Sequence, residues 1–261
     1  MARFCPLFSS SSGNCIYIGN NKTHILIDCG VSAKKVIEAL EGINVSPDDI
    51  SAVFITHEHS DHISGLHAFC AKRNIKIYAS IGTCVALSEM PKVCSGLDIS
   101  PIEDIIELPD ITVHRFKTSH DCADSSGYKI SLSGEHNFAV CTDTGCITRD
   151  LLGEIKGCDL ILLESNHDVT MLQKGPYTPS MKKRILSNEG HLSNGSCAEI
   201  LPELVDSGTT YIVLGHMSQN NNLPEVAEST AEAELIKHGL SRNQDYILYI
   251  APPSGGKLIS L

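Results

Sequence analysis

Short runs of apolar residues recur along the chain and alternate with stretches in which apolar and polar residues mix. The runs AVFIT, DLILLE and YIVLG are almost entirely apolar, which is typical of strands covered on both faces of a sheet. We predict strands over residues 15–18, 24–28, 52–56, 75–79, 111–118, 128–133, 138–142, 160–164, 211–215 and 246–250.

Helical patterns fill most of the intervals between these strands. We predict helices over 33–40, 65–73, 83–88, 149–156, 180–186, 195–205 and 224–238. Pro224 suits the first turn of the last helix, and the polar SQNNN before it is typical of a turn. The alternation predicts a layered α/β fold. Because no repeat, linker or low-complexity segment interrupts it, we expect residues 1–261 to form a single domain.

Several predicted strands run directly into a residue that can bind a metal ion or take part in catalysis. His57 follows AVFIT, His120 follows FKTS, Asp143 follows FAVCT and His216 follows YIVLG. In α/β folds, ligands bind where strands end and loops begin. We therefore expect these side chains to meet at one site.

The densest cluster of such residues is THEHSDH at positions 56–62. His57 and His59 are two residues apart, so in an extended segment they project to the same side. Asp61 and His62 add a carboxylate and another imidazole in the same turn. Neutral imidazole and carboxylate suit zinc, manganese or iron. The H-x-H-x-D-H spacing between an apolar strand and a helix therefore predicts a metal site.

The segment HEHSDH resembles the signature of the metallo-β-lactamase superfamily, and the resemblance continues in order from residue 14 to about residue 222. It implies a four-layer αββα sandwich, in which two mixed sheets are covered by helices, and two divalent metal ions, which are zinc or manganese or alternatively iron. By this resemblance, one ion is bound by His57, His59 and His120 and the other by Asp61, His62 and His216, with Asp143 bridging them and Asp28 orienting a ligand.

Longer segments are similar to the bacterial YycJ/WalJ-like branch of this superfamily, which is related to ribonuclease Z-type phosphodiesterases. They are SSSSGNC at 9–15, ESNHD at 164–168, GHLSN at 190–194 and LGHMSQNNNLPE at 214–225. Glu164 and His191 resemble the pair that ribonuclease Z places beside its metals. The sequence has no insertion long enough for a β-CASP clamp domain and no tRNA-binding arm, which argues against tRNA maturation as its main activity.

The resemblance implies a dinuclear metal-dependent hydrolase, a phosphodiesterase or nuclease that is exonuclease-like on DNA or RNA. Two metal ions lower the pKa of a shared water towards about 7, and His191, oriented by Glu164, would protonate the leaving oxygen. The expected catalytic residues are thus Asp61, Glu164 and His191. Two alternatives stay open: hydrolysis of a thioester, lactone or β-lactam on the same fold, and a regulatory protein that retains the metal site.

Charge limits the partners that this chain can bind. Twenty Lys and Arg against 31 Asp and Glu leave a net charge of −11, which disfavours non-specific binding to nucleic acid or to an anionic membrane. Metal ions would oppose this negative charge locally. Four basic residues could also contact a phosphate backbone, or they form a solvated helix face: Lys174, Lys182, Lys183 and Arg184. The expected partner is a nucleic acid or a small phosphodiester, and not a membrane.

Eleven cysteines without a C-x-x-C motif lie mostly in apolar runs. We therefore expect reduced thiols that pack as small apolar residues in a cytoplasmic protein. The N-terminal segment has no apolar signal-peptide region, and no run reaches the roughly 18 apolar residues of a membrane span.

Two roles stay open. Ser9 to Gly13 form a phosphate-binding turn or an ordinary loop, and His167 contacts substrate phosphate or is structural.

Overall fold

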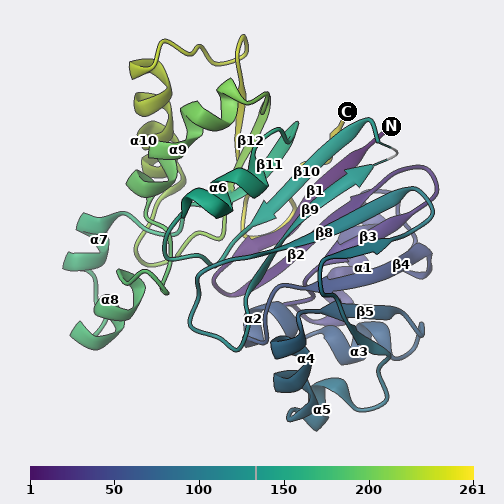
Figure 1. Cartoon of the computed structure of the whole chain (residues 1–261). Coiled ribbons are helices and arrows are strands. Elements are labelled where there is room, and N and C mark those ends of the chain that lie inside the picture. The colour runs from purple at the N-terminus through teal and green to yellow at the C-terminus, as the bar shows by residue number, and fades with distance from the viewer. Residues whose placement is uncertain (133) are drawn as a thin grey trace.

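The computed structural model describes residues 1–132 and 134–261, whose strands form two mixed sheets of seven strands each (Figure 1). The strands of the first sheet run in the order β14 (Ile259–Ser260), β1 (Arg3–Ser10), β2 (Gly13–Gly19), β3 (His24–Ile27), β4 (Ile50–Ile55), β5 (Lys76–Ala79) and β6 (Ile99–Pro101). Pairing is antiparallel from β14 to β3 and parallel from β3 to β6.

The second sheet has the same mixed character. Its strands run in the order β13 (Ile247–Ile250), β12 (Tyr211–Gly215), β11 (Leu160–Glu164), β10 (His136–Cys141), β9 (Ser126–Leu132), β8 (Ile111–Lys117) and β7 (Ile105–Glu107). Pairing is parallel from β13 to β10 and antiparallel from β10 to β7. The parallel halves have their carboxyl ends at one edge, and this edge carries the site.

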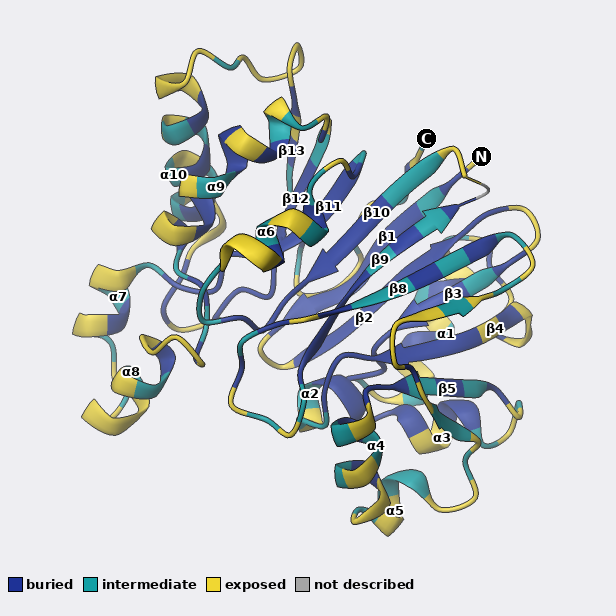
Figure 2. Ribbon diagram, viewed as in Figure 1, coloured by how far each residue is buried: buried dark blue, intermediate teal, exposed yellow. Residues whose placement is uncertain are grey.

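The two sheets pack face to face around an apolar core. Phe4 of β1 contacts Phe138 of β10 with ring centroids 6.0 Å apart, and Phe54 of β4 contacts Tyr128 of β9 at 5.6 Å. The hydroxyl of Tyr128 donates a hydrogen bond of 2.6 Å to the carbonyl of Ile55, so the phenol is satisfied inside this core. Figure 2 shows the inner strands buried along most of their length.

Helices cover the outer faces of both sheets. Those packed on the first sheet are α1 (Ala33–Gly42), α3 (Leu66–Cys70), α4 (Ile81–Ser88) and α5 (Pro91–Cys94), with the 3-10 turn Pro47–Asp49 and the short α2 (Ser60–Ile63) nearby. The second sheet is covered by α6 (Arg149–Ile155), α9 (Asn194–Asp206) and α10 (Pro224–Lys237). Two more helices, α7 (Val169–Lys174) and α8 (Pro179–Ile185), project to one side in Figure 1. The layers confirm the predicted αββα sandwich.

The predicted strands and helices are present, with ends shifted by a few residues; the predicted strand 128–133 includes Ser133, which lies outside the described residues. The strands β1, β6, β7 and β14 and the helices α2, α5 and α7 were not predicted, and α3 ends at Cys70 rather than at residue 73. The end of β1 falls in Ser9 to Gly13, for which an ordinary loop was one of two expectations. Pro6 lies within the strand, and the register with β2 shifts between Pro6 and Phe8, which accommodates a residue without an N–H.

The remaining missed elements are short, so their apolar pattern is too brief to be recognised. None of the helices in residues 1–132 and 134–261 has the length and apolar content needed to cross a bilayer.

Candidate metal centre

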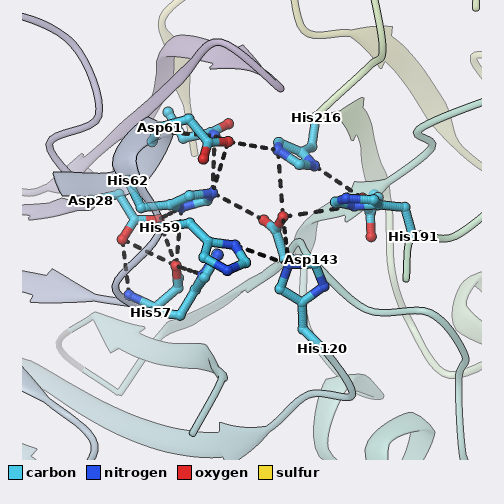
Figure 3. A network of polar contacts seen from close by, with 12 residues as sticks. Asp28, His57, His59, Asp61, His62, His120, Asp143, His191 and His216 are labelled. Atoms are coloured by element: carbon cyan, nitrogen blue, oxygen red, sulfur yellow. Dashed lines mark hydrogen bonds and ion pairs between the residues drawn. The ribbon is translucent and has the colours of Figure 1, made fainter. Parts of the chain in front are cut away.

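The residues that the sequence analysis assigned to metal binding and catalysis lie in one cluster at the strand ends (Figure 3). His57 and His59 follow β4, and α2 carries Asp61 and His62. The others come from the second sheet and its loops: His120 after β8, Asp143 after β10, Glu164 at the end of β11, His191 before α9 and His216 after β12.

Their potential ligand atoms form four sets, and within each set all atoms lie within 4.8 Å of one another. The sets are His57, His59 and His120; Asp61, His62 and His216; His57, His62 and Asp143; and Asp143, Glu164, His191 and His216. The third set takes one member from each of the first two. Asp143 therefore lies between two groups of three side chains, each of which could hold an ion.

Several polar atoms in the cluster are buried without a hydrogen bond. His57 Nε2, Asp143 Oδ2 and His216 Nε2 have no hydrogen-bond partner among the residues that the structure describes. Leaving such an atom unpaired costs about 1–3 kcal/mol, so each one needs an explanation. Imidazole nitrogen and carboxylate oxygen are ligands for divalent transition metals. The donor set therefore fits bound metal ions.

Hydrogen bonds at the ring nitrogen Nδ1 orient four of the histidines. Nδ1 of His62 lies 2.7 Å from Asp28 Oδ2, and Nδ1 of His216 lies 2.9 Å from Glu164 Oε1. In the same way, Nδ1 of His120 lies 2.9 Å from the carbonyl of Gly190 and Nδ1 of His57 lies 3.0 Å from Thr56 Oγ1. Each partner accepts a hydrogen bond from Nδ1–H, which leaves Nε2 as the potential ligand atom of each ring.

Thr56 and the Gly190 carbonyl are orienting groups that the sequence analysis did not find. Thr56 Oγ1 also lies 2.9 Å from Asp28 Oδ2, and the Thr56 N–H donates to Asp28 Oδ1 at 2.8 Å. The position of Thr56 directly before the motif was a usable signal. Nothing in the sequence indicated Gly190, because a backbone carbonyl is available at every position.

The buried carboxylates of the cluster stabilise positive charge on the groups beside them. Burial disfavours charge on His216, but Asp143, Asp61 and Glu164 together outweigh burial and raise the pKa of His216 to about 10. Burial likewise opposes ionisation of Glu164, yet His191 and His216 hold the pKa of this carboxyl well below its usual range. An environment that favours protonated imidazole also favours a metal cation, which competes with protons for the same nitrogen atoms.

Three members of the cluster have a backbone conformation that L-amino acids rarely adopt. The φ angles of Asp28, Asp143 and His216 are 63°, 55° and 53°, in the left-handed region. Each residue lies within two positions of the end of a strand. Backbone strain of this kind is concentrated at functional sites, and here it redirects each side chain from the strand into the cluster.

Glu164 and His191 form a pair at the edge of the cluster. Nδ1 of His191 lies 2.7 Å from Glu164 Oε1, and the N–H groups of Thr144 and Leu192 donate to Glu164 Oε2 at 2.8 and 3.3 Å. Glu164 is fully buried, whereas the His191 side chain is 12% exposed. His191 thus has its Nδ1 held by a fixed carboxylate and its ring at the wall of an open cavity.

This cavity has a volume of about 510 Å³ and opens onto the cluster. His59, Asp61, Asp143, His191 and His216 contribute to its wall. The rest of the wall comes from two loops and the α7–α8 segment: Ser11, Asn166, Pro176, Tyr177, Thr178, Met181, Arg184, Ile185 and Ser218. Its size lies in the range of about 300–1,000 Å³ that is common for small-ligand sites.

The weaker candidates from the sequence are placed differently. Of the four basic residues, Arg184 lines the cavity, whereas Lys174, Lys182 and Lys183 are absent from its described wall. The serine segment is a hairpin, in which Ser11 reaches the cavity.

His167 is buried, and neither of its ring nitrogens has a hydrogen-bond partner in the described part of the chain. It is also absent from the cavity wall formed by these residues.

Comparison with known proteins agrees with this architecture. Residues 23–217 match the family model described as "Beta-lactamase superfamily domain". The chain is 36% identical over 257 residues to "Exodeoxyribonuclease WalJ" of Streptococcus pneumoniae, covering 96% of this chain and 94% of the relative. It is 32% identical over 252 residues to "Exodeoxyribonuclease YycJ" of Bacillus anthracis, with 96% and 95% covered.

A solved structure shows the same fold at low sequence identity. The metallo-beta-lactamase fold protein YhfI from Bacillus subtilis superposes with a TM-score of 0.74 at 16% identity, covering 99% of this chain and 98% of that protein. The family match and the full-length relatives lead to one conclusion. The chain belongs to the beta-lactamase superfamily, in the branch that contains the exodeoxyribonucleases WalJ and YycJ.

Proposed function

We propose that this protein is a metal-dependent phosphodiesterase that removes nucleotides from the end of DNA. The observation that carries the proposal is the Glu164–His191 pair at the wall of a cavity that opens onto two adjoining groups of side chains that could hold metal ions. Two relatives that are named exodeoxyribonucleases and match almost the whole chain support DNA as the substrate.

Two divalent ions, zinc, manganese or iron, fit the donor set. In our proposal, one group is His57, His59 and His120, the other is Asp61, His62 and His216, and Asp143 lies between them. When bound, the ions supply a water of lowered pKa and positive charge beside a phosphate oxygen. The histidines are oriented by hydrogen bonds from their Nδ1 atoms to Asp28, Thr56, Glu164 and the Gly190 carbonyl.

Asp61 is expected to position the attacking water as well as to bind metal. Its Oδ2 lies 3.4 Å from His62 Nε2 and 3.5 Å from His216 Nε2, and its side chain is 23% exposed at the cavity wall. The second carboxylate oxygen can therefore accept a hydrogen bond from a water in the cavity.

His191 acts as the general acid in this proposal. Glu164 accepts a hydrogen bond from Nδ1–H and fixes the orientation of the ring, so a proton on Nε2 can pass to the oxygen that leaves phosphorus. The P–O bond to this oxygen breaks as the new P–O bond to the attacking water forms. Proton transfer of this kind accelerates a reaction by about 10² to 10⁴.

The test compares two leaving groups in the His191→Gln variant. On end-labelled DNA, whose alkoxide leaving group needs a proton, kcat is expected to fall by about 10² to 10⁴. On bis-p-nitrophenyl phosphate, whose leaving group is stable as an anion, the loss is expected to be much smaller. Metal content, measured by mass spectrometry, should stay at the wild-type level.

The control is His67→Gln, because His67 is an exposed histidine on α3 that contacts the carbonyl of Ser95 far from the cavity. Equal losses on both substrates with His191→Gln would refute the general-acid role. Absence of cleavage of DNA with every divalent metal, together with turnover of a chromogenic cephalosporin, a thioester or a lactone, would refute the proposed function itself.

We also place the protein in the cytoplasm, because all eleven cysteines are free and reduced thiols persist in that compartment. Cell fractionation followed by immunoblotting tests this location, and recovery outside the cytoplasm would contradict it.

A further inference from the structure

The α7–α8 segment forms one wall of the cavity, and the proposed chemistry uses none of its residues. Its turn and α8 contribute Tyr177, Met181 and Arg184 among other residues. In Figure 1, α7 and α8 lie beyond the edge of the sheets, next to the strand ends that carry the metal cluster. A side chain on this wall can therefore contact the part of a substrate that extends from the cluster into the cavity.

Tyr177 presents an aromatic ring on a stiff support. It is the one phenyl or phenol side chain in the described wall of the cavity. The Nδ2 of Asn220, from the loop before α10, donates a hydrogen bond of 3.1 Å to the Tyr177 hydroxyl, which connects the ring to that loop. Pro176 and Pro179 restrict the backbone around it. A rigid aromatic side chain loses little conformational entropy when a ligand stacks on it.

The support under Tyr177 is also tightly packed. A Cβ on Gly175 would lie 2.4 Å from Asn221 Oδ1 and 2.9 Å from the carbonyl of Met171, so the chain enters the turn in close contact with its neighbours. At the exit, the Met181 N–H donates to Thr178 Oγ1 at 3.3 Å and caps α8. Both ends of the turn are thus anchored.

Arg184 presents a fixed positive charge to the same cavity. Its Nε and Nη2 donate to the two carboxylate oxygens of Asp121, the second at 2.6 Å. These hydrogen bonds raise the pKa of Arg184 above its ordinary value, and the negative charges of Asp143 and Asp61 in the metal cluster add to the effect. A guanidinium has five N–H groups, and among the described residues Nη1 has no partner. Arg184 therefore retains donors for an anion.

An aromatic ring and a clamped guanidinium on one wall match the two parts of a nucleotide. Aromatic side chains stack on bases without sequence preference, and arginine binds phosphate through paired N–H donors. We propose, on the basis of the proposed nuclease function, that Tyr177 and Arg184 bind the terminal nucleotide of the substrate, with the base on the Tyr177 ring and a phosphate at Arg184.

The described wall of the cavity also has a consequence for the DNA. A terminal base that leaves its partner and its stack to enter the cavity can stack on the Tyr177 ring. This contact compensates part of the cost of unpairing. The substrate of this subsite is an unpaired terminal nucleotide.

The test measures kcat/KM on two DNA ends, one with a normal terminal nucleotide and one whose terminal unit is an abasic tetrahydrofuran analogue. The wild type is expected to prefer the normal end by about tenfold, which corresponds to about 1.4 kcal/mol. Tyr177→Leu is expected to lose this preference, whereas Tyr177→Phe, which keeps the ring, retains it. Arg184→Gln is expected to lower kcat/KM on both ends about equally and to leave the preference intact.

The matched control for charge is Lys35→Gln, because Lys35 is an exposed residue of α1 on the opposite helix layer. Metal content and the turnover of bis-p-nitrophenyl phosphate by Tyr177→Leu show whether the metal site is intact. Equal kcat/KM of the wild type on the two ends would overturn this inference, and so would a Tyr177→Leu variant that loses activity equally on both. Absence of any DNA cleavage by the metal-loaded wild type would instead overturn the proposed function, and this inference with it.

Discussion

Replacing Thr56 with valine removes one buried hydroxyl while leaving the shape of the side chain almost unchanged. Thr56 is 1% exposed, and its Oγ1 lies within 3.1 Å of Asp28, of His57 Nδ1 and of His62 Nδ1. His62 Nδ1 keeps its contact with Asp28 at 2.7 Å, and Asp28 keeps the backbone N–H of residue 56 at 2.8 Å. His57 Nδ1 alone loses its partner.

The magnitude follows from this single loss. One buried N–H without an acceptor costs about 1–3 kcal/mol. Burial is the main reason why the pKa of His57 lies well below its ordinary value, so the ring is neutral. The neutral ring is then free to flip or to change tautomer. Loss of an orienting partner behind a metal-binding histidine typically lowers metal affinity by about 10- to 100-fold.

The assay is competition between the protein and a chromogenic zinc chelator, combined with urea unfolding of the metal-free protein. Thr56→Val is expected to bind metal about 10- to 100-fold more weakly and to lose about 1–3 kcal/mol of unfolding free energy. Thr56→Ser keeps the hydroxyl and should stay close to the wild type in both measurements. Metal affinity of Thr56→Val within twofold of the wild type would refute the reasoning, because the hydroxyl would then not orient His57.

Three further predictions concern the metal cluster and its support. Asp143→Asn is expected to lose metal, measured by mass spectrometry, and with it DNA cleavage. Full metal content would contradict the role of Asp143 as a ligand between the two groups. Gly30→Ala is expected to destabilise the protein by about 3 kcal/mol in urea unfolding, since a Cβ would lie 1.6 Å from the Asp61 carbonyl oxygen; a wild-type midpoint would contradict this packing. Burial lowers the pKa of His167 to about 4, so the unfolded chain takes up this proton near pH 6.5 and the folded chain only near pH 4. The associated stability, about 3 kcal/mol, is present above pH 6.5 and is lost as the pH falls towards 4; His167→Gln should lack this part of the pH dependence, and identical profiles would refute it.

Much of the fold could be predicted because the long strands carry an unmistakable apolar pattern. The runs that became β4, β11 and β12 are buried on both faces, and their sequences show it without reference to any partner. The strand β1 could not be recognised in this way, because Pro6 and the serines are tolerated only through its pairing with β2 and β14. That residues 1–261 form one domain stays a prediction, tested by a single cooperative unfolding transition.

The sequence by itself determined the chemical types at the metal site. HEHSDH places three imidazoles and two carboxylates within six residues, so a local segment supplies several candidate ligands whatever the rest of the chain does. The residues at positions 120, 143, 164, 191 and 216 could also be predicted as site candidates. Each one follows a strand or lies in a motif that resembles a known family.

Only the tertiary structure decided how these residues meet. The backbone N–H of His216 donates a hydrogen bond to Ser9 Oγ, which is 207 residues away, and the His216 ring contacts Glu164. The left-handed backbone of Asp143 and the contact between Tyr177 and Asn220 are likewise products of packing. Contacts between distant segments depend on how whole layers fit together, and no local pattern encodes them. This is why candidate ligands could be named from the sequence, whereas the orientation of each ring and the cavity wall opposite them could not.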